Sequence, residues 1–580
     1  MNQSQLLTRH SIRLFSRPHL RHATSLTHPS RKSLPRRLVQ GAAMATLATT
    51  LTVGIGSTVL YYTSDRFRHV AHALDRCRLA GTVGAQVAYD YHRTLAQTYP
   101  DPDGYDEAIR ACHQRSANKV LRAIQQLGGV YVKLGQHISV MQYLLPDEWC
   151  LTMRVLQDQC VPTPPEAIEA LFMSDMGLPV ESIFEEFDWT PLGVASLAQV
   201  HRAKLAHQPD SEDDLWVAVK LQHPYLDEYC QLDMDTVSFL FEIIKRVFPD
   251  FGFDWFAEEM RESIPKELDF VHETQNARRV RDNFADDVDQ HRTSLVIPKV
   301  IWAKRRIMCM EFINGSRVDD LEYMRQHQID PREVSNELTR VFSEMIFLHG
   351  FVHCDPHPGN VFIRANKNAK HNFDLVLLDH GLYRELSDEL RSNYAQLWTS
   401  LIKADEQGIQ TYAQLVGGTE IYQLFACMLT GREWDKITQS DLGSTRQVEE
   451  VGRISEGALT YLVEVADILA KLPRPVLLLL KTNDLLRHVD EKLNANSDER
   501  MTYVLMGSYC SKAVWLDTKR YLSEKIRVVG FRWSLLKALV RAWWQYKSVT
   551  WLLWIYQISL KVTEKVNWSN PKKITHSSSL

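Results

Sequence analysis

The chain has 580 residues, of which 45% are hydrophobic and 24% charged, an ordinary composition for a globular protein. This length accommodates a two-lobed catalytic core with additional segments. The formal net charge of −4 conceals an asymmetry, because residues 1–40 hold eight Arg and Lys with no acidic residue, and residues 525–580 hold ten against Glu564 alone. The remaining middle is therefore acidic, which argues against nucleic acid as the main partner. Basic ends on an acidic body instead suit a protein whose ends lie near an anionic membrane.

The nine cysteines are scattered along the chain and form no Cys-x-x-Cys pair. This spacing indicates neither a disulfide framework nor a zinc site. We therefore expect unpaired thiols.

The N-terminal segment 1–37 is rich in arginine and contains no acidic residue. This character predicts a mitochondrial transit peptide, with a disordered basic tail as the alternative. The uncharged stretch 38–62 follows, and it is long enough to cross a bilayer as a transmembrane helix. A buried helix or an extended presequence are the alternatives for this stretch. Because arginines flank both of its ends, the side of the membrane that holds the body stays open.

The rest of the chain predicts an α+β protein with a helical N-terminal extension. Segment 65–180 has helical patterns, and segment 181–315 contains short β-type runs interrupted by a helical region at 227–284. The predicted strands lie at 194–204, 216–221, 295–302 and 306–312. Segment 316–524 is rich in helices, so strands precede helices as in a two-lobed fold.

One helix start in the second lobe is well marked. Asp330 can act as N-cap, Pro331 suits the first helical position, and Glu333 suits a capping box. Apolar residues then recur at helical spacing, which predicts a helix from Pro331 onward.

The C-terminal segment 525–580 predicts basic, Trp-rich helices. Six tryptophans between positions 533 and 568 alternate with arginine and lysine. Such a helix is typical of a membrane interface, where indole rings lie at headgroup level. The alternative is that these tryptophans pack on the helical lobe.

A lysine and a helix carboxylate form the first part of a predicted active site. The run Trp216-Val-Ala-Val-Lys220 is an apolar strand that ends in lysine, like the V-A-I-K pattern that places an ammonium on nucleotide phosphates. Downstream, Glu267 and Glu273 are six residues apart, hence about 240° apart around a helix. Since both cannot face the lysine, we assign Glu273 to Lys220 and leave Glu267 and Asp269 for a separate contact.

Two further motifs follow in kinase order. In His353-Cys-Asp355-Pro-His-Pro-Gly-Asn360, the aspartate and asparagine have the spacing of H-R-D-x-x-x-x-N. This spacing predicts Asp355 near the attacking hydroxyl or water and Asn360 on a magnesium ion. Nineteen residues after Asn360, Asp379-His-Gly matches the D-F-G metal ligand with histidine in place of phenylalanine. The sequence thus predicts a bilobal protein-kinase-like fold that binds ATP or ADP with Mg²⁺, with Lys220 and Asp355 as catalytic residues and Asn360 and Asp379 as metal ligands.

The sequence departs from protein kinases in three respects. Ala195 and Ser196 lie where a glycine-rich loop would cover the phosphates, and their β-carbons hinder close approach of the backbone. Cys354 replaces the usual arginine, and no A-P-E signal follows Gly381. These differences leave little room for a peptide platform and argue against protein phosphorylation.

Together these motifs resemble the UbiB/aarF-domain-containing (ADCK) family of atypical kinases. The residues that carry the resemblance are Lys133-Leu-Gly-Gln136, Ala195-Ser196, Val217-Ala-Val-Lys220, Glu267-Leu-Asp269, the loop from His353 to Asn360, and Asp379-His-Gly381. The similarity extends from about residue 112 to residue 487. The Asp-His-Gly variant and the overall layout look closest to the fifth animal member.

The resemblance implies a particular arrangement of the nucleotide-binding residues. Lys133 and Gln136 would lie across the would-be substrate site, against Glu267, Asp269 and the magnesium site. The family's alanine-rich loop favours ADP over ATP, but here Gly193 and Val194 replace two expected alanines, so the preference stays open.

The resemblance also implies a biological setting. The family is associated with mitochondrial membranes and with coenzyme Q or phospholipid homeostasis. We therefore expect an atypical kinase or ATPase that is anchored at a mitochondrial membrane, and we expect that membrane to be the inner one. Its expected substrate is a membrane lipid or a quinone-like small molecule. The main alternative is a pseudokinase that binds lipid or protein in a nucleotide-dependent way. An aminoglycoside-phosphotransferase-like enzyme would share only the H-x-D-x-x-x-x-N element. The oligomeric state stays open.

Overall fold

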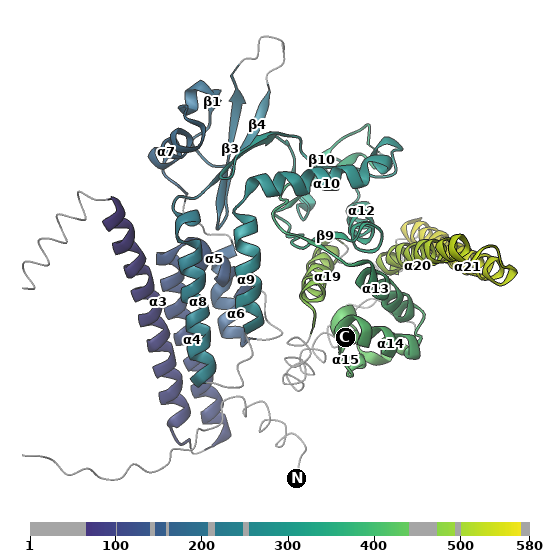
Figure 1. Ribbon diagram of the computed structural model, residues 1–580, viewed down its shortest axis with the longest axis horizontal. Helices are drawn as coiled ribbons and strands as arrows, with labels where there is room; N and C mark the ends of the chain where they lie inside the picture. The colour runs from purple at the N-terminus through teal and green to yellow at the C-terminus, as the bar shows by residue number, and fades with distance from the viewer. Residues whose placement is uncertain are drawn as a thin grey trace, which may run out of the picture. The chain divides into compact units, whose positions relative to one another are not determined.

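The computed structural model describes most of the chain between residues 65 and 569 (Figure 1). The described ranges are 65–99, 101–139, 145–157, 162–206, 215–247, 254–369, 371–439, 472–493 and 500–569. The predicted transit peptide 1–37 and transmembrane segment 38–62 lie outside them. Within these ranges, none of the helices has both the length and the apolar character needed to cross a bilayer.

The chain folds into two compact units. The first comprises residues up to 161 together with 194–197 and 223–261, and the second comprises 162–193, 198–222 and 262 onward. The units therefore group the chain differently from the predicted boundaries at 180, 315 and 524, which stay predictions.

The first unit consists of helices. They are α3 (Asp65–Ala96), α4 (Pro102–Leu127), α5 (Gly129–Ser139), α6 (Asp147–Met153), the 3-10 helix η2 (Arg154–Gln157), α8 (Leu226–Val247) and the first part of α9 (Asp254–Glu267). Its core includes the buried side chains of Ile124, Tyr131, Met153 and Val237, one from each of four helices. Gly128 and Gly129 have φ of 67° and 51°, so the sharp turn between α4 and α5 favours residues without a β-carbon.

The second unit begins with a mainly antiparallel sheet in the strand order β1-β3-β4-β7-β6, with β2 paired to β3. The strands are β1 (Phe184–Phe187), β2 (Gly193–Val194), β3 (Ala198–Leu205), β4 (Trp216–Gln222), β6 (Val300–Ala303) and β7 (Ile307–Glu311). Helix α7 (Pro165–Met176) and the 3-10 helix η3 (Val180–Ser182) precede them. Ile168 and Phe172 of α7 pack in one buried cluster with Val217 and Val219 of β4.

Two predicted strands are shorter than the sequence suggested. The run 194–204 is divided, because Val194 belongs to β2, residues 195–197 are not in a strand, and β3 begins at Ala198. The run 295–302 divides into β5 (Leu295–Val296) and β6 around Pro298, which has no N–H for a sheet ladder.

A second sheet and several helices complete this unit. The remaining strands are β8 (Ser316–Arg317), β9 (Phe351–His353), β10 (Val361–Ala365), β11 (Phe373–Leu377) and β12 (Tyr383–Glu385). They form a sheet in the order β5-β11-β10-β8 and a separate β12-β9 pair. The helices are α10 (Phe270–Asp289), α11 (Leu321–Gln326), α12 (Pro331–Glu344), the π-helical turn η4 (Met345–His349), α13 (Asp388–Ile402), α14 (Glu406–Gly417), α15 (Tyr422–Thr430), α16 (Trp434–Thr438), α19 (Arg474–Leu493), α20 (Arg500–Val529) and α21 (Trp533–Ser569).

Helix α12 begins where the sequence predicted. Asp330 accepts a hydrogen bond from the amide of Arg332 at 3.0 Å, and Pro331 is the first helical residue. The carboxylate of Glu333 lies 3.6 Å from Nδ1 of His371, an alternative to the predicted capping box. The helix packs through Leu338 and Phe342 into a buried core cluster that also contains residues of strands β10 and β11.

Candidate active site

Lys220 and Glu273 form a buried ion pair in the second unit. The Nζ atom of Lys220 on β4 lies 2.8 and 2.9 Å from the two carboxylate oxygens of Glu273 on α10. Glu273 is only 1% exposed. The structure therefore brings together the two residues that helical spacing had paired.

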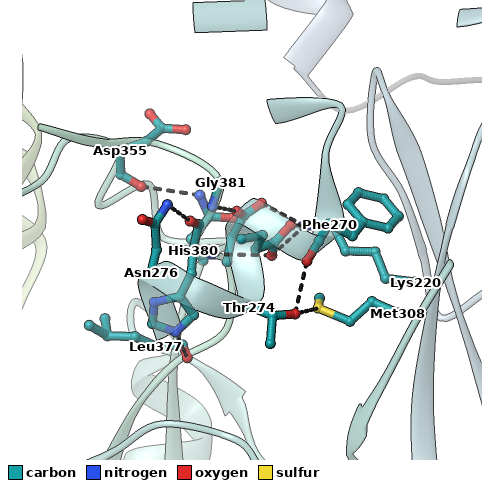
Figure 2. Close-up of polar contacts among 12 residues, drawn as sticks. Lys220, Phe270, Thr274, Asn276, Met308, Asp355, Leu377, His380 and Gly381 are labelled. Carbon is teal, nitrogen blue, oxygen red and sulfur yellow. Dashed lines mark hydrogen bonds and ion pairs between the residues drawn. The ribbon is translucent and has the colours of Figure 1, made fainter. Parts of the chain in front are cut away.

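The local sequence explains why Glu273 faces the lysine. Asp269 is the N-cap of α10 and accepts hydrogen bonds from the amides of Val271 at 2.9 Å and His272 at 3.3 Å. Thr274 donates to the carbonyl of Phe270 at 2.8 Å and lies 3.6 Å from the sulfur of Met308 on β7 (Figure 2). This first turn fixes the helix against the sheet, and Glu273 lies within it.

Asp379 is the second carboxylate on Lys220. Its Oδ2 atom lies 3.3 Å from Nζ, and its Oδ1 atom accepts a hydrogen bond from the amide of Gly381 at 2.8 Å. The Asp379 side chain is 39% exposed, in contrast to that of Glu273. A β-carbon on Gly381 would lie 3.1 Å from Oδ1 of Asp379 and 3.7 Å from Cγ of Glu267, so Glu267 lies beside this motif.

The pKa values of Lys220 and Glu273 depend on their burial and on the charges of their neighbours. Burial disfavours the ammonium of Lys220, but the carboxylates of Asp379 and Glu273 outweigh that effect and hold its pKa above the usual value. Burial raises the pKa of Glu273 to about 7, although the Lys220 ammonium acts in the opposite direction. Lys220 is therefore a permanent cation that two carboxylates share.

His380, which replaces the phenylalanine of D-F-G, is a buried neutral imidazole. Burial lowers its pKa to about 3. Its Nε2 atom lies 3.1 Å from the carbonyl of Leu377, which can only accept, so Nδ1 accepts from the hydroxyl of Tyr383 at 2.9 Å. Its backbone amide donates to Glu273 at 3.2 Å, and its carbonyl accepts from Asn276 at 3.0 Å (Figure 2). The histidine thus fixes the backbone on which Asp379 is carried.

His353 links the two downstream motifs. Its Nδ1 accepts from the amide of Asp355 at 3.0 Å, so its Nε2 carries the proton and donates to the carbonyl of Asp379 at 3.0 Å. The Nδ2 atom of Asn360 donates to the carbonyl of Asp355 at 3.1 Å, which leaves its carbonyl oxygen as the side-chain group suited to a cation. Asp355, Asn360 and Asp379 are therefore held by one hydrogen-bonded framework.

Lys481 is a site residue that the motifs did not reveal. It lies on α19, and its Nζ atom donates to Oδ1 of Asp355 at 3.0 Å. Their side chains are 23% and 27% exposed, so this contact is much less buried than the Lys220 pair. Lys481 ends a run of leucines without any kinase motif, and only that break in an apolar run could have drawn attention to it.

The first unit contains Gln136 together with the Ala195–Ser196 loop. The hydroxyl of Ser196 donates to Oε1 of Gln136 at 3.1 Å, and Nε2 of Gln136 donates to the carbonyl of Leu156 at 2.9 Å. The carbonyl of Ala195 accepts from His223 at 2.9 Å. Gln136 and Lys133 share helix α5. The expected contact of Lys133 and Gln136 with Glu267 and Asp269 joins the two units and stays a prediction.

The geometry of the second unit defines a protein-kinase-like site. A strand lysine meets a helix glutamate and a strand-end aspartate, and a turn carrying Asp355 and Asn360 lies on the same framework. Comparison with known proteins agrees with this class: residues 155–413 match the ABC1 atypical kinase-like domain.

Full-length relatives extend the match beyond that domain. The chain is 39% identical over 543 residues to the ABC1 family protein MCP2 of Saccharomyces cerevisiae, covering 91% of this chain and 92% of that protein. It is 40% identical to the AarF domain-containing protein kinase 1 of Xenopus laevis, covering 74% and 81%. It is 35% identical to the AarF domain-containing kinase 1 of Drosophila melanogaster, covering 80% and 90%. The chain therefore belongs to the ABC1/AarF family of atypical kinases.

Family membership confirms the resemblance and the predicted α+β, bilobal kinase-like fold. The match to the fifth animal member is not resolved, since the animal relatives above carry the name of kinase 1. Among solved structures, the erythromycin complex of Rv3197 from Mycobacterium tuberculosis aligns with a TM-score of 0.38 at 18% identity, covering 67% of this chain and 98% of that one. This structural likeness is too weak to support an argument.

Proposed function

We propose that the chain binds a magnesium–adenine nucleotide in this site and acts as an ATPase or a small-molecule phosphotransferase. The observation that supports this most directly is the group of Lys220, Glu273 and Asp379, with Nζ of Lys220 at 2.8 Å from one carboxylate and 3.3 Å from the other. Phosphoryl transfer depends on positioning and charge neutralisation, which such a group can supply.

The residues present fit a magnesium ion. Among the described residues no cluster of three or more His, Cys, Asp or Glu could hold a metal alone. Mg²⁺ does not need such a cluster, because it takes one or two protein oxygens and completes its shell with phosphates and water. Asp379 offers a partly exposed carboxylate and Asn360 an amide oxygen. A bound ion would neutralise phosphate charge there.

The other residues have complementary roles in this proposal. Lys220 would contact the nucleotide phosphates and Glu273 would hold its ammonium in place. Asp355 would accept a proton from the attacking water or hydroxyl. Lys481, at 3.0 Å from that carboxylate, would keep it oriented.

The main alternative is a pseudokinase that binds nucleotide without turnover. The 3.0 Å contact of Lys481 with Asp355 favours it, because a carboxylate held by an ammonium is a weaker base. The presence of all four of Lys220, Asp355, Asn360 and Asp379 favours the active enzyme, which we prefer.

The setting that we propose is a mitochondrial membrane, with coenzyme Q or lipid homeostasis as the process and a membrane lipid or quinone-like molecule as the acceptor. The arginine-rich start of the chain and its ABC1/AarF membership support this proposal. A nucleotide-dependent change in lipid or quinone extracted with the protein would identify the acceptor class.

The test is magnesium-dependent ATP hydrolysis by the full chain and three variants. Asp355→Asn and Asp379→Asn should each lower the rate by about 100-fold or more, as expected when a charged group in the reacting centre is lost. Asp484→Asn, an exposed aspartate on α19, is the matched control and should retain the wild-type rate. Equal rates of ATP hydrolysis in the wild type and all three variants would contradict the proposed ATPase activity. Nucleotide binding by calorimetry without any hydrolysis would support the pseudokinase.

A further inference from the structure

The last helix, α21, is covered by the protein on one face only. Taking about 100° per residue, Leu535, Ala542, Tyr546 and Leu553 fall within about 40° of one line along the helix. Tyr546 stacks on Trp515 of α20, with ring centroids 6.1 Å apart and planes 5° apart. A β-carbon on Gly507 of α20 would lie 3.6 Å from Leu553. Helix α20 therefore covers this face (Figure 1).

The opposite face of α21 is apolar and exposed. We define the outward stripe as the six apolar residues between positions 533 and 558 that lie within about 40° of the opposite line, at about 100° per residue: Trp533, Val540, Trp544, Trp551, Ile555 and Ile558. Two polar residues, Lys537 and Ser548, lie on the same face. The side chains of the six stripe residues are 42–70% exposed. The flanking Trp543 and Trp554 are also exposed, at 43% and 59%. A mostly apolar exposed surface of this kind marks an interaction site in a folded protein.

The composition of the stripe favours a lipid surface over a protein groove. Tryptophan is the most frequent large side chain on it, and indole rings prefer the boundary between hydrocarbon and water. Lys537, on the same face as the stripe, and Arg541, beside it, are exposed. The only acidic residue from 525 onward is Glu564. Such a positive surface complements anionic headgroups, whereas a second copy of the same helix would bring like charges together.

We propose that the outward stripe of α21 binds the surface of an anionic lipid bilayer. Because α20 covers the opposite face, lipid cannot surround the helix, so α21 lies in the plane of the membrane interface. The stripe inserts its tryptophans at headgroup level, and the lysine and arginine beside it contact the headgroups. This inference does not depend on nucleotide binding.

The test measures binding of the full chain to vesicles of phosphatidylcholine with about 30% phosphatidylserine, and to vesicles of phosphatidylcholine alone. The stripe variant is W544S/W551S/I555S. The control variant V288S/L321S/L415S removes three apolar side chains that are 44%, 46% and 56% exposed on other helices. The wild type and the control variant should bind anionic vesicles alike, and the stripe variant should bind at least about tenfold more weakly. Neutral vesicles should bind all three weakly.

Every variant retains segment 38–62, so a second measurement reports on the tryptophans of α21 themselves. Brominated phospholipids quench tryptophans that enter the bilayer, so quenching should be smaller in the stripe variant than in the wild type. The single change Trp551→Ser, at an exposed position, should lower vesicle binding in the same direction if the triple variant fails to fold. Equal vesicle binding, or equal quenching, of wild type and stripe variants would overturn the proposal. A wild-type dimer that the stripe substitutions dissociate, with vesicle binding unchanged, would assign the stripe to a second copy instead.

Discussion

The candidate site contains two lysine–carboxylate contacts that differ in nearly every physical respect. Lys220 meets Glu273, which is 1% exposed, and also Asp379. Lys481 meets Asp355 with both side chains about a quarter exposed, at 23% and 27%. A buried pair is costly to break because the remaining charge has neither water nor a partner, whereas water can replace the lost partner in a partly exposed pair. The first contact therefore supports the structure of the lobe, and the second one mainly orients a reacting group.

The largest effect on stability is expected from Lys220→Met, which leaves Glu273 buried without its cation. The free energy of unfolding should fall by about 3 kcal/mol, and K220M/E273Q should recover most of that loss. Chemical denaturation of the wild type and both variants measures it. A loss below about 1 kcal/mol in K220M would contradict the contrast between the two contacts.

The pH dependence of stability should come next. The pKa of Glu273 is raised from its ordinary 4.5 to about 7 in the folded state, chiefly by burial. Between these pH values Glu273 is protonated in the folded state and ionised in the unfolded state. Its contribution to the free energy of unfolding therefore decreases as pH rises from about 4.5 to about 7, and stays constant at higher pH. The stability difference between wild type and Glu273→Gln should therefore decline from about pH 5 to about pH 7.5. Parallel unfolding curves for the two proteins across that range would contradict this assignment.

Much of the buried half of the site could be predicted from the sequence. Lys220 lies near the end of the apolar strand β4, Asp379 follows β11 by two residues, and Glu273 lies in the first turn of a helix, so local periodicity and motif spacing placed all three. The histidine of Asp379-His-Gly was noticed, but its role was not, because the residue pattern does not show that its ring lies between the hydroxyl of Tyr383 and the carbonyl of Leu377.

The remaining features depend on tertiary packing. Lys481 lies 126 residues from Asp355, and no spacing rule connects a residue on α19 with a turn that far upstream. Asp269 was left, together with Glu267, for a separate contact, which stays a prediction, and the sequence analysis did not identify its carboxylate as the N-cap of α10. For α21, the face that packs on α20 carries Tyr546, whereas Trp533, Trp544 and Trp551 are exposed, so the predicted contact of these tryptophans with a membrane stays a proposal.

The cap of α10 should have a smaller effect on stability than the buried pair. Asp269→Ala removes the acceptor for two amides and should cost about 1 kcal/mol, while Asp269→Ser should retain most of the stability. Asp330→Ala on α12 is the matched control, since it removes a similar cap from a helix that carries no site lysine or its partner. If the cap positions Glu273, D269A should weaken nucleotide binding and D330A should not. Equal nucleotide affinity in D269A and D330A, measured by titration calorimetry, would reduce Asp269 to a purely local role.

The smallest change in stability is expected from Lys481→Met. Because both side chains of the contact with Asp355 are partly exposed, its loss should alter the free energy of unfolding by less than about 1 kcal/mol. If Lys481 orients Asp355, the same change should lower kcat of ATP hydrolysis by about tenfold and leave KM nearly unchanged, in the range expected for a group that acts on proton transfer. Lys481→Arg should restore part of the rate. Lys492→Met, which removes an exposed pair with Asp319 from the same helix, should leave both constants unchanged. A higher kcat in K481M would instead show that Lys481 inhibits Asp355, as the pseudokinase alternative requires. The direction of the change in kcat therefore decides whether Lys481 orients Asp355 for catalysis or suppresses it.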